Sequence, residues 1–181
     1  MIKIVKQIPL IILAVFFFSA QLACAEGSGD AEPAYGDAIV IGSISDARTL
    51  VPILASDSAS SDITGLVFNG LVKYDKDVRI IGDLAKEWDI LDGGMTIVFH
   101  LRKDVRWHDG APLTSKDVEF TYKKLIDPNV KTPYSGDFER VKSFEVIDDH
   151  TVKVTYKEPF SPALSSWGMP VMPYHLLKDA D

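Results

Sequence analysis

Residues 84–122 constrain the fold more strongly than any other stretch of the chain. The pair Gly93-Gly94 separates two segments with strand character, residues 87–91 (EWDIL) and residues 95–101 (MTIVFHL). Glycine adopts positive φ at little steric cost, so this arrangement predicts a β-hairpin. Alternation along the second strand predicts two opposite faces, formed by Ile97, Phe99 and Leu101 and by Thr96, Val98 and His100.

A helix is predicted directly after this hairpin and the tight turn at residues 107–110 (WHDG). Thr114 is a good helix N-cap, and Asp117 stands three residues later, where the acid of a capping box belongs. Val118, Tyr122 and Leu125 recur at i, i+4 and i+7. This spacing predicts an amphipathic helix with one buried stripe.

The same stretch resembles the signature region of a known protein family. The matching pieces are Leu84-Ala85 with Trp88, then FHLR (99–102), VRWHDG (105–110) and LTSKDV (113–118). In this order and spacing they are similar to the family 5 extracellular solute-binding proteins, the oligopeptide, dipeptide and nickel binders of ABC transporters. The resemblance extends over about residues 38–181.

Hairpins alternate with isolated helices along the chain, which predicts a mixed α+β (α/β) architecture with a largely antiparallel sheet. The resemblance implies that residues 38–181 form the N-terminal part of a two-lobed, type II periplasmic-binding-protein fold, incomplete because family members are far longer. Residues 38–60 are expected to start the first lobe, residues 61–172 to form an attached subdomain, and residues 173–181 to return toward the first lobe. We expect either a fragment of a longer protein or a truncated gene product.

The segment before the signature stretch predicts a strand followed by a helix. Residues 38–42 (AIVIG) are a short apolar run typical of a buried strand. Ser60 or Ser61 is the candidate N-cap of the helix, and Gly70 is placed to end it. The predicted buried face of this helix consists of Ile63, Leu66, Val67 and Leu71.

Two further hairpins and a short helix are predicted. Residues 71–74 are expected to pair with residues 78–81, and residues 144–147 with residues 151–156. The pair Ser161-Pro162 is typical of the N-cap and first residue of a short helix.

The N-terminal residues 1–25 have the pattern of a secretory signal peptide. Lys3 and Lys6 give a positive start, and residues 8–20 form an apolar stretch. This stretch is shorter than the about 20 residues that a membrane-spanning helix needs. We therefore expect an exported protein, periplasmic or at the cell surface.

The cleavage site leaves two alternatives open. Cleavage after Ala25 would release a free protein, whereas cleavage before Cys24 would leave a lipidated N-terminal residue and a membrane anchor. Cys24 is the only cysteine, so it has no disulfide partner within the chain. Residues 26–37 are small and polar, as a flexible tether is. These features favour the lipoprotein.

The charge of the chain argues against nucleic acid as a partner. Without residues 1–25 the chain has 17 basic and 26 acidic residues, a net charge of −9. The four histidines have no tight ligand spacing, and neither a G-x-S-x-G motif nor a P-loop is found. We therefore expect no catalytic residue, no metal and no cofactor. The resemblance implies a binding protein, which we expect to be a monomer.

The aromatic and turn residues near the histidines have structural interpretations. In the turn at residues 107–110, Asp109 is expected to accept backbone N–H groups while Gly110 takes positive φ. Trp88 and Trp107 are expected to pack on the core, because tryptophan buries a large area. For Trp167, packing and ligand stacking both remain open.

Five residues are candidates for ligand contact. Ser43, Ile44 and Ser45 follow the predicted first strand, whose end lies at the mouth of the ligand cleft in the family; an ordinary polar loop is the favoured alternative there. Tyr134 and Asp137 lie in the loop KTPYSGD (131–137), from which an aromatic or polar side chain reaches the cleft in relatives. A tyrosine that packs on its own loop is an equal alternative.

The resemblance implies the substrate-binding component of an ABC importer, which delivers peptides to permease subunits after two lobes close on the ligand. One alternative keeps the fold but binds a nickel–metallophore, haem or an oligosaccharide. An alternative from another class is a secreted hydrolase, which the missing nucleophile motif disfavours. This chain by itself is expected to bind ligand weakly or not at all.

Overall fold

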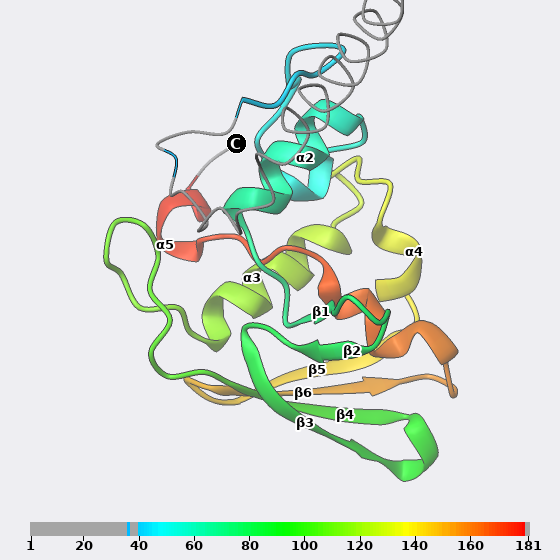
Figure 1. Ribbon diagram of the computed structural model, residues 1–181. Coiled ribbons are helices and arrows are strands. Elements are labelled where there is room, and N and C mark those ends of the chain that lie inside the picture. Colours follow the sequence, from blue (N-terminus) through cyan, green and yellow to red (C-terminus); the bar gives the residue numbers. More distant parts are fainter. Residues whose placement is uncertain (1–35, 37–39, 180–181) are drawn as a thin grey trace, which may run out of the picture. The chain divides into compact units, whose positions relative to one another are not determined.

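A four-stranded antiparallel sheet in the order β3-β4-β6-β5 forms the base of the fold (Figure 1). The computed structural model describes residue 36 and residues 40–179. The strands are β3 (Ala85–Leu91), β4 (Thr96–Leu101), β5 (Val141–Asp148) and β6 (Thr151–Tyr156). The predicted mixed fold with antiparallel hairpins is confirmed.

The hairpin between β3 and β4 forms where the glycine pair predicts it. Gly93 and Gly94 have φ of 67° and 93° within the short 3₁₀ turn η2 (Asp92–Gly94). Trp88 pairs with Phe99 across the two strands. The predicted inner face of β4 is buried, with Ile97, Phe99 and Leu101 in the core.

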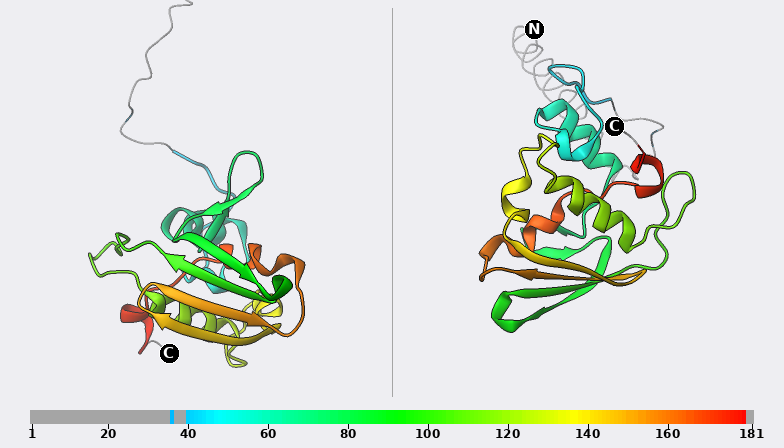
Figure 2. Two further views of the ribbon diagram at one scale, coloured as in Figure 1. Left: turned by 90° about the horizontal axis from the view of Figure 1, so that it is seen from below. Right: turned by 180° about the vertical axis from the view of Figure 1, so that it is seen from behind.

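Helix α3 (Ser115–Leu125) covers the inner face of the sheet. In the view from below, the sheet lies in front of the helix (Figure 2). Val118 and Leu125 are buried, and the Tyr122 ring stacks on Phe144 with a centroid distance of 4.9 Å. The Thr114 N–H donates to the Asp117 carboxylate over 2.8 Å, as in a capping box. The predicted helix, cap and buried stripe are therefore confirmed.

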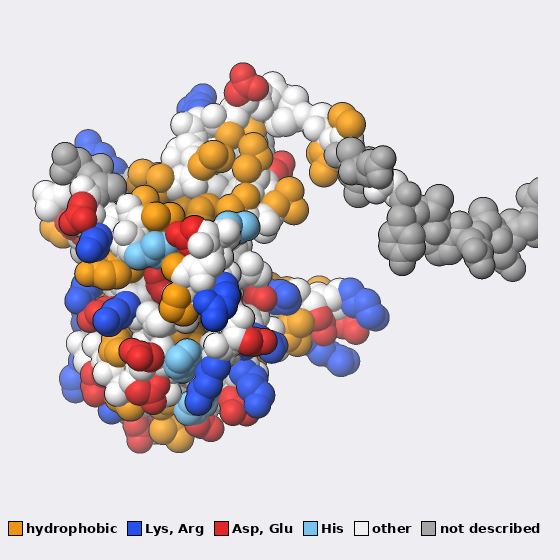
Figure 3. Space-filling view, turned by 90° about the vertical axis from the view of Figure 1, so that its left-hand side faces the viewer, with side chains coloured by type: hydrophobic (Ala, Val, Ile, Leu, Met, Phe, Trp, Pro, Cys, Tyr) orange, Lys and Arg blue, Asp and Glu red, His pale blue; other side chains and the backbone are white. Residues whose placement is uncertain are grey.

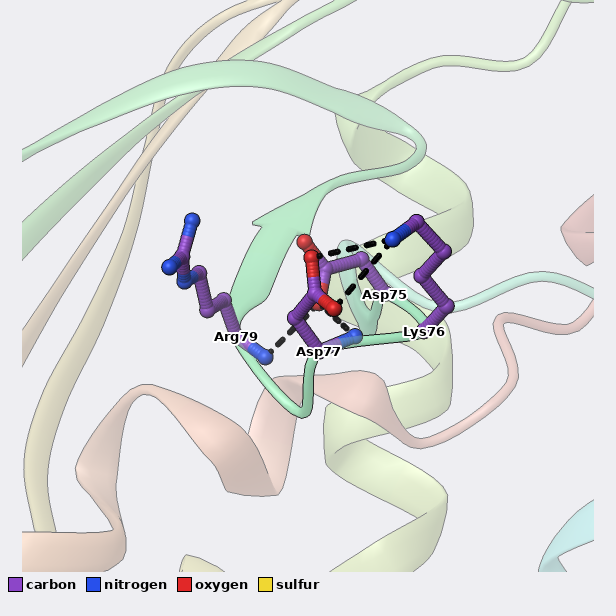
Figure 4. A network of polar contacts seen from close by, with 4 residues as sticks. All are labelled: Asp75, Lys76, Asp77 and Arg79. Carbon is purple, nitrogen blue, oxygen red and sulfur yellow. Dashed lines mark hydrogen bonds and ion pairs between the residues drawn. The ribbon is translucent and has the colours of Figure 1, made fainter.

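A separate two-stranded sheet pairs β1 (Val72–Tyr74) with β2 (Ile80–Gly82). One carboxylate oxygen of Asp75 accepts the N–H groups of Asp77 and Arg79, at 2.8 and 2.9 Å, and so holds the connecting turn (Figure 4). Val78 has a φ of 59°, a left-handed conformation that costs a β-branched residue free energy. The predicted hairpin is confirmed, with its second strand beginning at Ile80.

Helix α2 (Ser58–Val67) differs from its prediction at both ends and in its buried face. Its N-cap is Asp57, which accepts the Ser60 N–H over 2.9 Å, instead of Ser60 or Ser61. The buried residues of the helix are Ala59, Ser60 and Thr64, whereas Ile63, Leu66 and Val67 of the predicted face are exposed. The fourth residue of that face, Leu71, is buried but lies beyond the end of the helix. The Ser60 hydroxyl explains this orientation, because it accepts the backbone N–H groups of Arg48 and Thr49 and must therefore face inward.

Gly70 does not end α2, which stops at Val67, but it serves close packing. A Cβ atom on Gly70 would lie 2.4 Å from the carbonyl oxygen of Gly168. The backbone of Leu71 bonds to the same region, since its N–H donates to the Trp167 carbonyl oxygen over 2.8 Å. Glycine is therefore required at position 70 for the approach of two backbone segments.

The C-terminal part consists of tight turns rather than one short helix. The turn η3 (Ser161–Ala163) has Phe160 as its N-cap, so Ser161 lies inside the turn and the predicted cap is wrong. A second 3₁₀ turn, η4 (Ser165–Gly168), places the Trp167 ring in the core, 5.7 Å from that of Phe99. Two short helices, α4 (Ser135–Phe138) and α5 (Tyr174–Leu177), complete the described elements together with the 3₁₀ turn η1 (Pro52–Leu54).

Several sequence predictions concern residues near the N-terminus. Val40, Ile41 and Gly42, the described part of the predicted strand at 38–42, belong to no strand. The prediction is therefore wrong for these three residues. The signal peptide, Cys24 and all of the tether except Gly36 lie outside the described residues.

The boundary predicted between residues 60 and 61 falls within α2, and the division into lobe and subdomain stays a prediction. Among the helices in the described part of the chain, none is long and apolar enough to cross a membrane.

Candidate ligand-binding site

A cavity of about 500 Å³ lies between η1, α2, α4 and η4. Four segments that are far apart in the sequence meet around it. Glycine, proline and apolar side chains form much of its wall. The polar side chains on its wall are Ser61, Thr64, Tyr134, Asp137, Ser165 and Ser166. A concave, mixed surface of this size suits a small organic ligand.

Tyr134 is held across the cavity rather than on its own loop. Its hydroxyl donates to the carbonyl oxygen of Ala55 over 2.6 Å. The neighbouring Thr132 hydroxyl donates to the Ile53 carbonyl oxygen over 2.7 Å. These two bonds fix the loop at residues 131–137 to η1, and they leave the partly buried ring of Tyr134 on the cavity wall.

Asp137 lies on α4 and supplies a carboxylate to the same cavity. Its Oδ2 accepts the Ser166 hydroxyl over 2.7 Å, which joins α4 to η4. Among the described residues no lysine or arginine forms an ion pair with Asp137. The carboxylate therefore retains acceptor capacity for a cationic or N–H group of a ligand.

Phe138 on the cavity wall belongs to a buried aromatic cluster. Phe138 lines the cavity and meets Trp167 edge to face, with ring centroids 5.2 Å apart. The indole N–H of Trp167 donates to the Tyr156 hydroxyl over 2.9 Å, and that hydroxyl donates to the Ala163 carbonyl oxygen over 3.0 Å. Burial raises the pKa of Tyr156 to about 12, so this phenol stays protonated well into the alkaline range. Trp167 is thus a core residue, which resolves the alternative left open.

The other three candidate residues lie elsewhere. Ser43, Ile44 and Ser45 are exposed and do not line the cavity. The structure therefore brings Tyr134 and Asp137 together, and it separates them from the segment after the predicted first strand. The role of all five in ligand binding stays a prediction.

A second cavity of about 600 Å³ adjoins the first, and both are lined by Gly65, Ser165, Gly168 and Pro170. Its polar end is an exposed network in which Asp83 accepts from Lys73 at 3.0 Å and from Asn69 at 2.7 Å. Sequence reasoning did not find Ser165 or Thr64, because neither belongs to a motif that marks ligand contact. The only local signal was the serine pair at 165–166, and Thr64 had none.

The turn at residues 107–110 has the predicted structural role and one further contact. The Ala111 N–H donates to Asp109 over 3.0 Å, and Gly110 has a φ of 89°. The Nε2 atom of His175 lies 2.6 Å from the other Asp109 oxygen, and this hydrogen bond lowers the pKa of Asp109. Within the described residues, no group of three His, Cys, Asp or Glu side chains is arranged to hold a metal ion.

Comparison with known proteins places this arrangement in a family. Residues 79–180, more than half of the chain, match the model of the bacterial extracellular solute-binding proteins, family 5 Middle. The oligopeptide-binding protein AppA of Bacillus subtilis is 30% identical over 176 residues, which are 93% of this chain and 32% of AppA. The chain therefore spans about a third of the length of this relative.

Two solved structures share the fold. NikZ from Campylobacter jejuni, in complex with Ni(L-His), has a TM-score of 0.69 and 31% identity over 75% of this chain and 27% of its own. AppA from Bacillus subtilis, in complex with a nonapeptide, has a TM-score of 0.66 and 28% identity over 72% of this chain and 26% of its own. The fold is thus that of part of a type II periplasmic binding protein, as the sequence predicts.

Proposed function

The chain belongs to the family 5 bacterial extracellular solute-binding proteins, and we propose that it forms part of the substrate-binding component of an ABC importer for peptides. In this role it acts outside the cytoplasm, delivers its ligand to permease subunits and catalyses no reaction. The export signal at residues 1–25 and the lipid anchor at Cys24 belong to the same proposal.

The observation that carries the proposal is the convergence of Tyr134 and Asp137 on one cavity wall. The family resemblance implies that a side chain of the loop that bears them reaches the ligand cleft. A carboxylate without a described cationic partner suits the amino group or the N–H groups of a peptide. The tyrosine ring adds apolar area for a side chain, and its hydroxyl is already bonded to Ala55.

Nickel complexes are the second candidate, because NikZ was solved with Ni(L-His). The two candidates make different demands on the cavity. A free metal ion needs several ligating side chains, and none of the described residues form such a group. A metal already enclosed by a chelator needs only shape and hydrogen bonds, so the cavity is compatible with it.

Binding is tested by NMR titration of this chain with tri-alanine, with a nonapeptide and with Ni(L-His). We expect a weak interaction, with Kd of about 1 mM, because the chain spans a third of a relative's length. Peptide-induced shift changes should be confined to the backbone amides of Gly65, Gly136 and Ser166.

Single substitutions test whether the peptide binds at the cavity. Asp137→Asn should weaken peptide binding at least severalfold, whereas Asp89→Asn on the outer face of the sheet should not change it. Shift changes with Ni(L-His) but not with peptides would favour the nickel candidate. Cleavage of the peptide during the titration would contradict the proposal and favour a secreted hydrolase.

A further inference from the structure

The cavity of about 500 Å³ lined by Asp137, which we call the Asp137 cavity, carries a single charge on its wall. On the side of the molecule where α5 lies, by contrast, acidic and basic side chains are intermixed over the lower part of the surface (Figure 3). Asp137 is the only charged residue among those that line the cavity. The wall therefore presents one negative charge and no cation that would compensate for it.

The Asp137 carboxylate is held in position while one of its oxygens stays open. Oδ2 accepts the Ser166 hydroxyl over 2.7 Å, which ties the side chain to η4. No described residue donates a hydrogen bond to Oδ1. Asp137 is exposed, so a ligand can reach this carboxylate from solvent. A positioned and accessible carboxylate oxygen is the natural acceptor for an ammonium or guanidinium group.

The hydroxyl groups on the wall add acceptors rather than donors. Tyr134 donates its hydroxyl hydrogen to the Ala55 carbonyl oxygen over 2.6 Å. Thr64 and Ser165 donate theirs, over 2.9 and 3.1 Å, to backbone carbonyl oxygens a few residues earlier in the chain. A hydroxyl has one donor hydrogen and two acceptor lone pairs, so these groups can offer only lone pairs to a ligand. The side chains of the wall therefore favour a ligand group that is rich in N–H donors.

The remaining wall is apolar and suits a hydrocarbon chain. Pro52, Phe138, Met169 and Pro170 line it together with the ring of Tyr134. Lysine and arginine carry their charge at the end of an apolar stem, which packs on such a surface while the charged end reaches an acceptor. The terminal ammonium of a peptide has no stem of this kind. The Asp137 cavity therefore suits a basic side chain better than it suits an N-terminus.

We propose that the Asp137 cavity binds a lysine or arginine side chain of a peptide. The stem of that side chain lies against the apolar wall, and its cationic end donates to Oδ1 of Asp137. The substrate class is then peptides that contain a basic residue. This inference rests on the proposed peptide-binding function and adds a charge preference to it.

The preference is measured by NMR titration of this chain with three tripeptides that are blocked at both ends. Their outer residues are alanine, and the central residue is lysine, norleucine or glutamate, so that only the central side chain can be charged. The lysine peptide should bind about three- to fivefold more tightly than the norleucine peptide, as expected for an ion pair at an exposed carboxylate. The glutamate peptide should bind more weakly than either. The preference for lysine should disappear at about 1 M salt.

Two substitutions of the same kind locate the preference. Asp137→Asn keeps the shape of the side chain and should make the lysine and norleucine peptides bind equally. Asp62→Asn removes the same charge from an exposed position on α2, next to Ser61 but off the cavity wall, and should retain the preference. The NMR spectra of the free variants confirm that both fold. A preference for lysine that survives Asp137→Asn would contradict the proposal.

The other outcomes separate this inference from the peptide-binding function. Equal binding of the lysine and norleucine peptides would overturn the inference and leave peptide binding intact. If the norleucine peptide with a free N-terminus binds more tightly than the blocked lysine peptide, the carboxylate serves the terminal ammonium and the inference is wrong. Butylammonium is the probe that is not a peptide. Shift changes at Gly136 and Ser166 with butylammonium, but with no peptide, would support the cation preference of the cavity and contradict the peptide function. No shift change with any probe would overturn both.

Discussion

Helices α3 and α2 have nearly the same length, 11 and 10 residues. Helix α3 buries its apolar stripe, whereas α2 exposes its own. Helix α3 packs Val118 and Leu125 against the sheet and turns lysines to solvent. Helix α2 buries Ser60 and Thr64 and leaves Leu66 in solvent. The two helices show that apolar periodicity identifies a stripe but does not say what covers it.

The physical cause of the difference lies in the partners of each helix. Helix α3 lies on a sheet whose inner face is apolar, so burial of its stripe removes hydrocarbon from water. Helix α2 is oriented instead by hydrogen bonds, because Ser60 must accept from Arg48 and Thr49 while Asp57 caps the first turn. Its apolar stripe faces away as a consequence.

Truncation of one leucine to alanine in each helix should give the largest difference in stability. Leu125→Ala on α3 removes a fully buried side chain and should lower the free energy of unfolding by about 2–5 kcal/mol. Leu66→Ala on α2 should change it by less than about 0.5 kcal/mol. Urea denaturation followed by circular dichroism measures both. A loss above 1 kcal/mol for Leu66→Ala would mean, on the scale of surface substitutions, that its side chain is already covered in the isolated chain.

The pH dependence of the free energy of unfolding should distinguish buried from exposed tyrosines. Burial raises the pKa of Tyr156 in the folded state to about 12, above its value of about 10 in the unfolded chain. The contribution of Tyr156 to the free energy of unfolding is therefore complete below pH 10 and is lost as the pH rises to 12. The free energy of unfolding should fall by up to about 3 kcal/mol over that range. Tyr156→Phe should flatten the profile, whereas Tyr74→Phe at an exposed site should retain it.

Removal of the cap of α3 should lower the free energy of unfolding more than removal of the cap of α2. The Asp117 side chain accepts the N–H groups of Thr114 and of Tyr174, at 2.8 and 2.9 Å, so it ties the start of α3 to α5. Asp117→Ala should lower the free energy of unfolding by about 2 kcal/mol, because buried donors lose their acceptor. Asp57→Ala on α2 should have a smaller effect. Thermal denaturation ranks the variants, and equal losses would show that the cap of α3 has no tertiary role.

The smallest effect is expected on the solvent side of α3. Lys123 and Glu119 form an i, i+4 ion pair at 2.8 Å, and Lys123 is mostly exposed. Lys123→Gln should lower the free energy of unfolding by only about 0.3 kcal/mol, and the difference should vanish at about 1 M salt. A loss as large as that of Asp117→Ala would contradict the division of α3 into a buried and a solvated side.

Sequence reasoning succeeded where several local signals agreed. At residues 85–125 the glycine pair, strand alternation, capping box and helical periodicity all indicate one hairpin and one helix, and the structure contains both. It failed at α2, where the segment at residues 56–61 offers several candidate caps and the apolar spacing alone suggested the buried face. The cap that forms is Asp57, because its two carboxylate oxygens reach both the N–H and the hydroxyl of Ser60.

The candidate site was predicted only in part for a related reason. Tyr134 and Asp137 could be chosen because their loop resembles one that reaches the ligand in relatives. Ser166 could not, because its approach to Asp137 joins residues 29 positions apart and depends on the 3₁₀ turn η3 before it and on η4, which contains it. Such contacts depend on chain geometry that no short motif encodes.

The amino-acid sequence by itself determined the hairpin of β3 and β4, the capped helix α3 and the membership of a solute-binding family. The hairpin and the helix depend on backbone preferences and side-chain spacing within a few residues, which act without any distant segment. The family was indicated by the resemblance of the motifs along residues 84–118. Only the tertiary structure decided that α2 turns its apolar stripe outward, that Gly70 meets Gly168, and that Tyr134 and Asp137 share a cavity. Burial is a property of two surfaces, so it is settled only when distant segments meet.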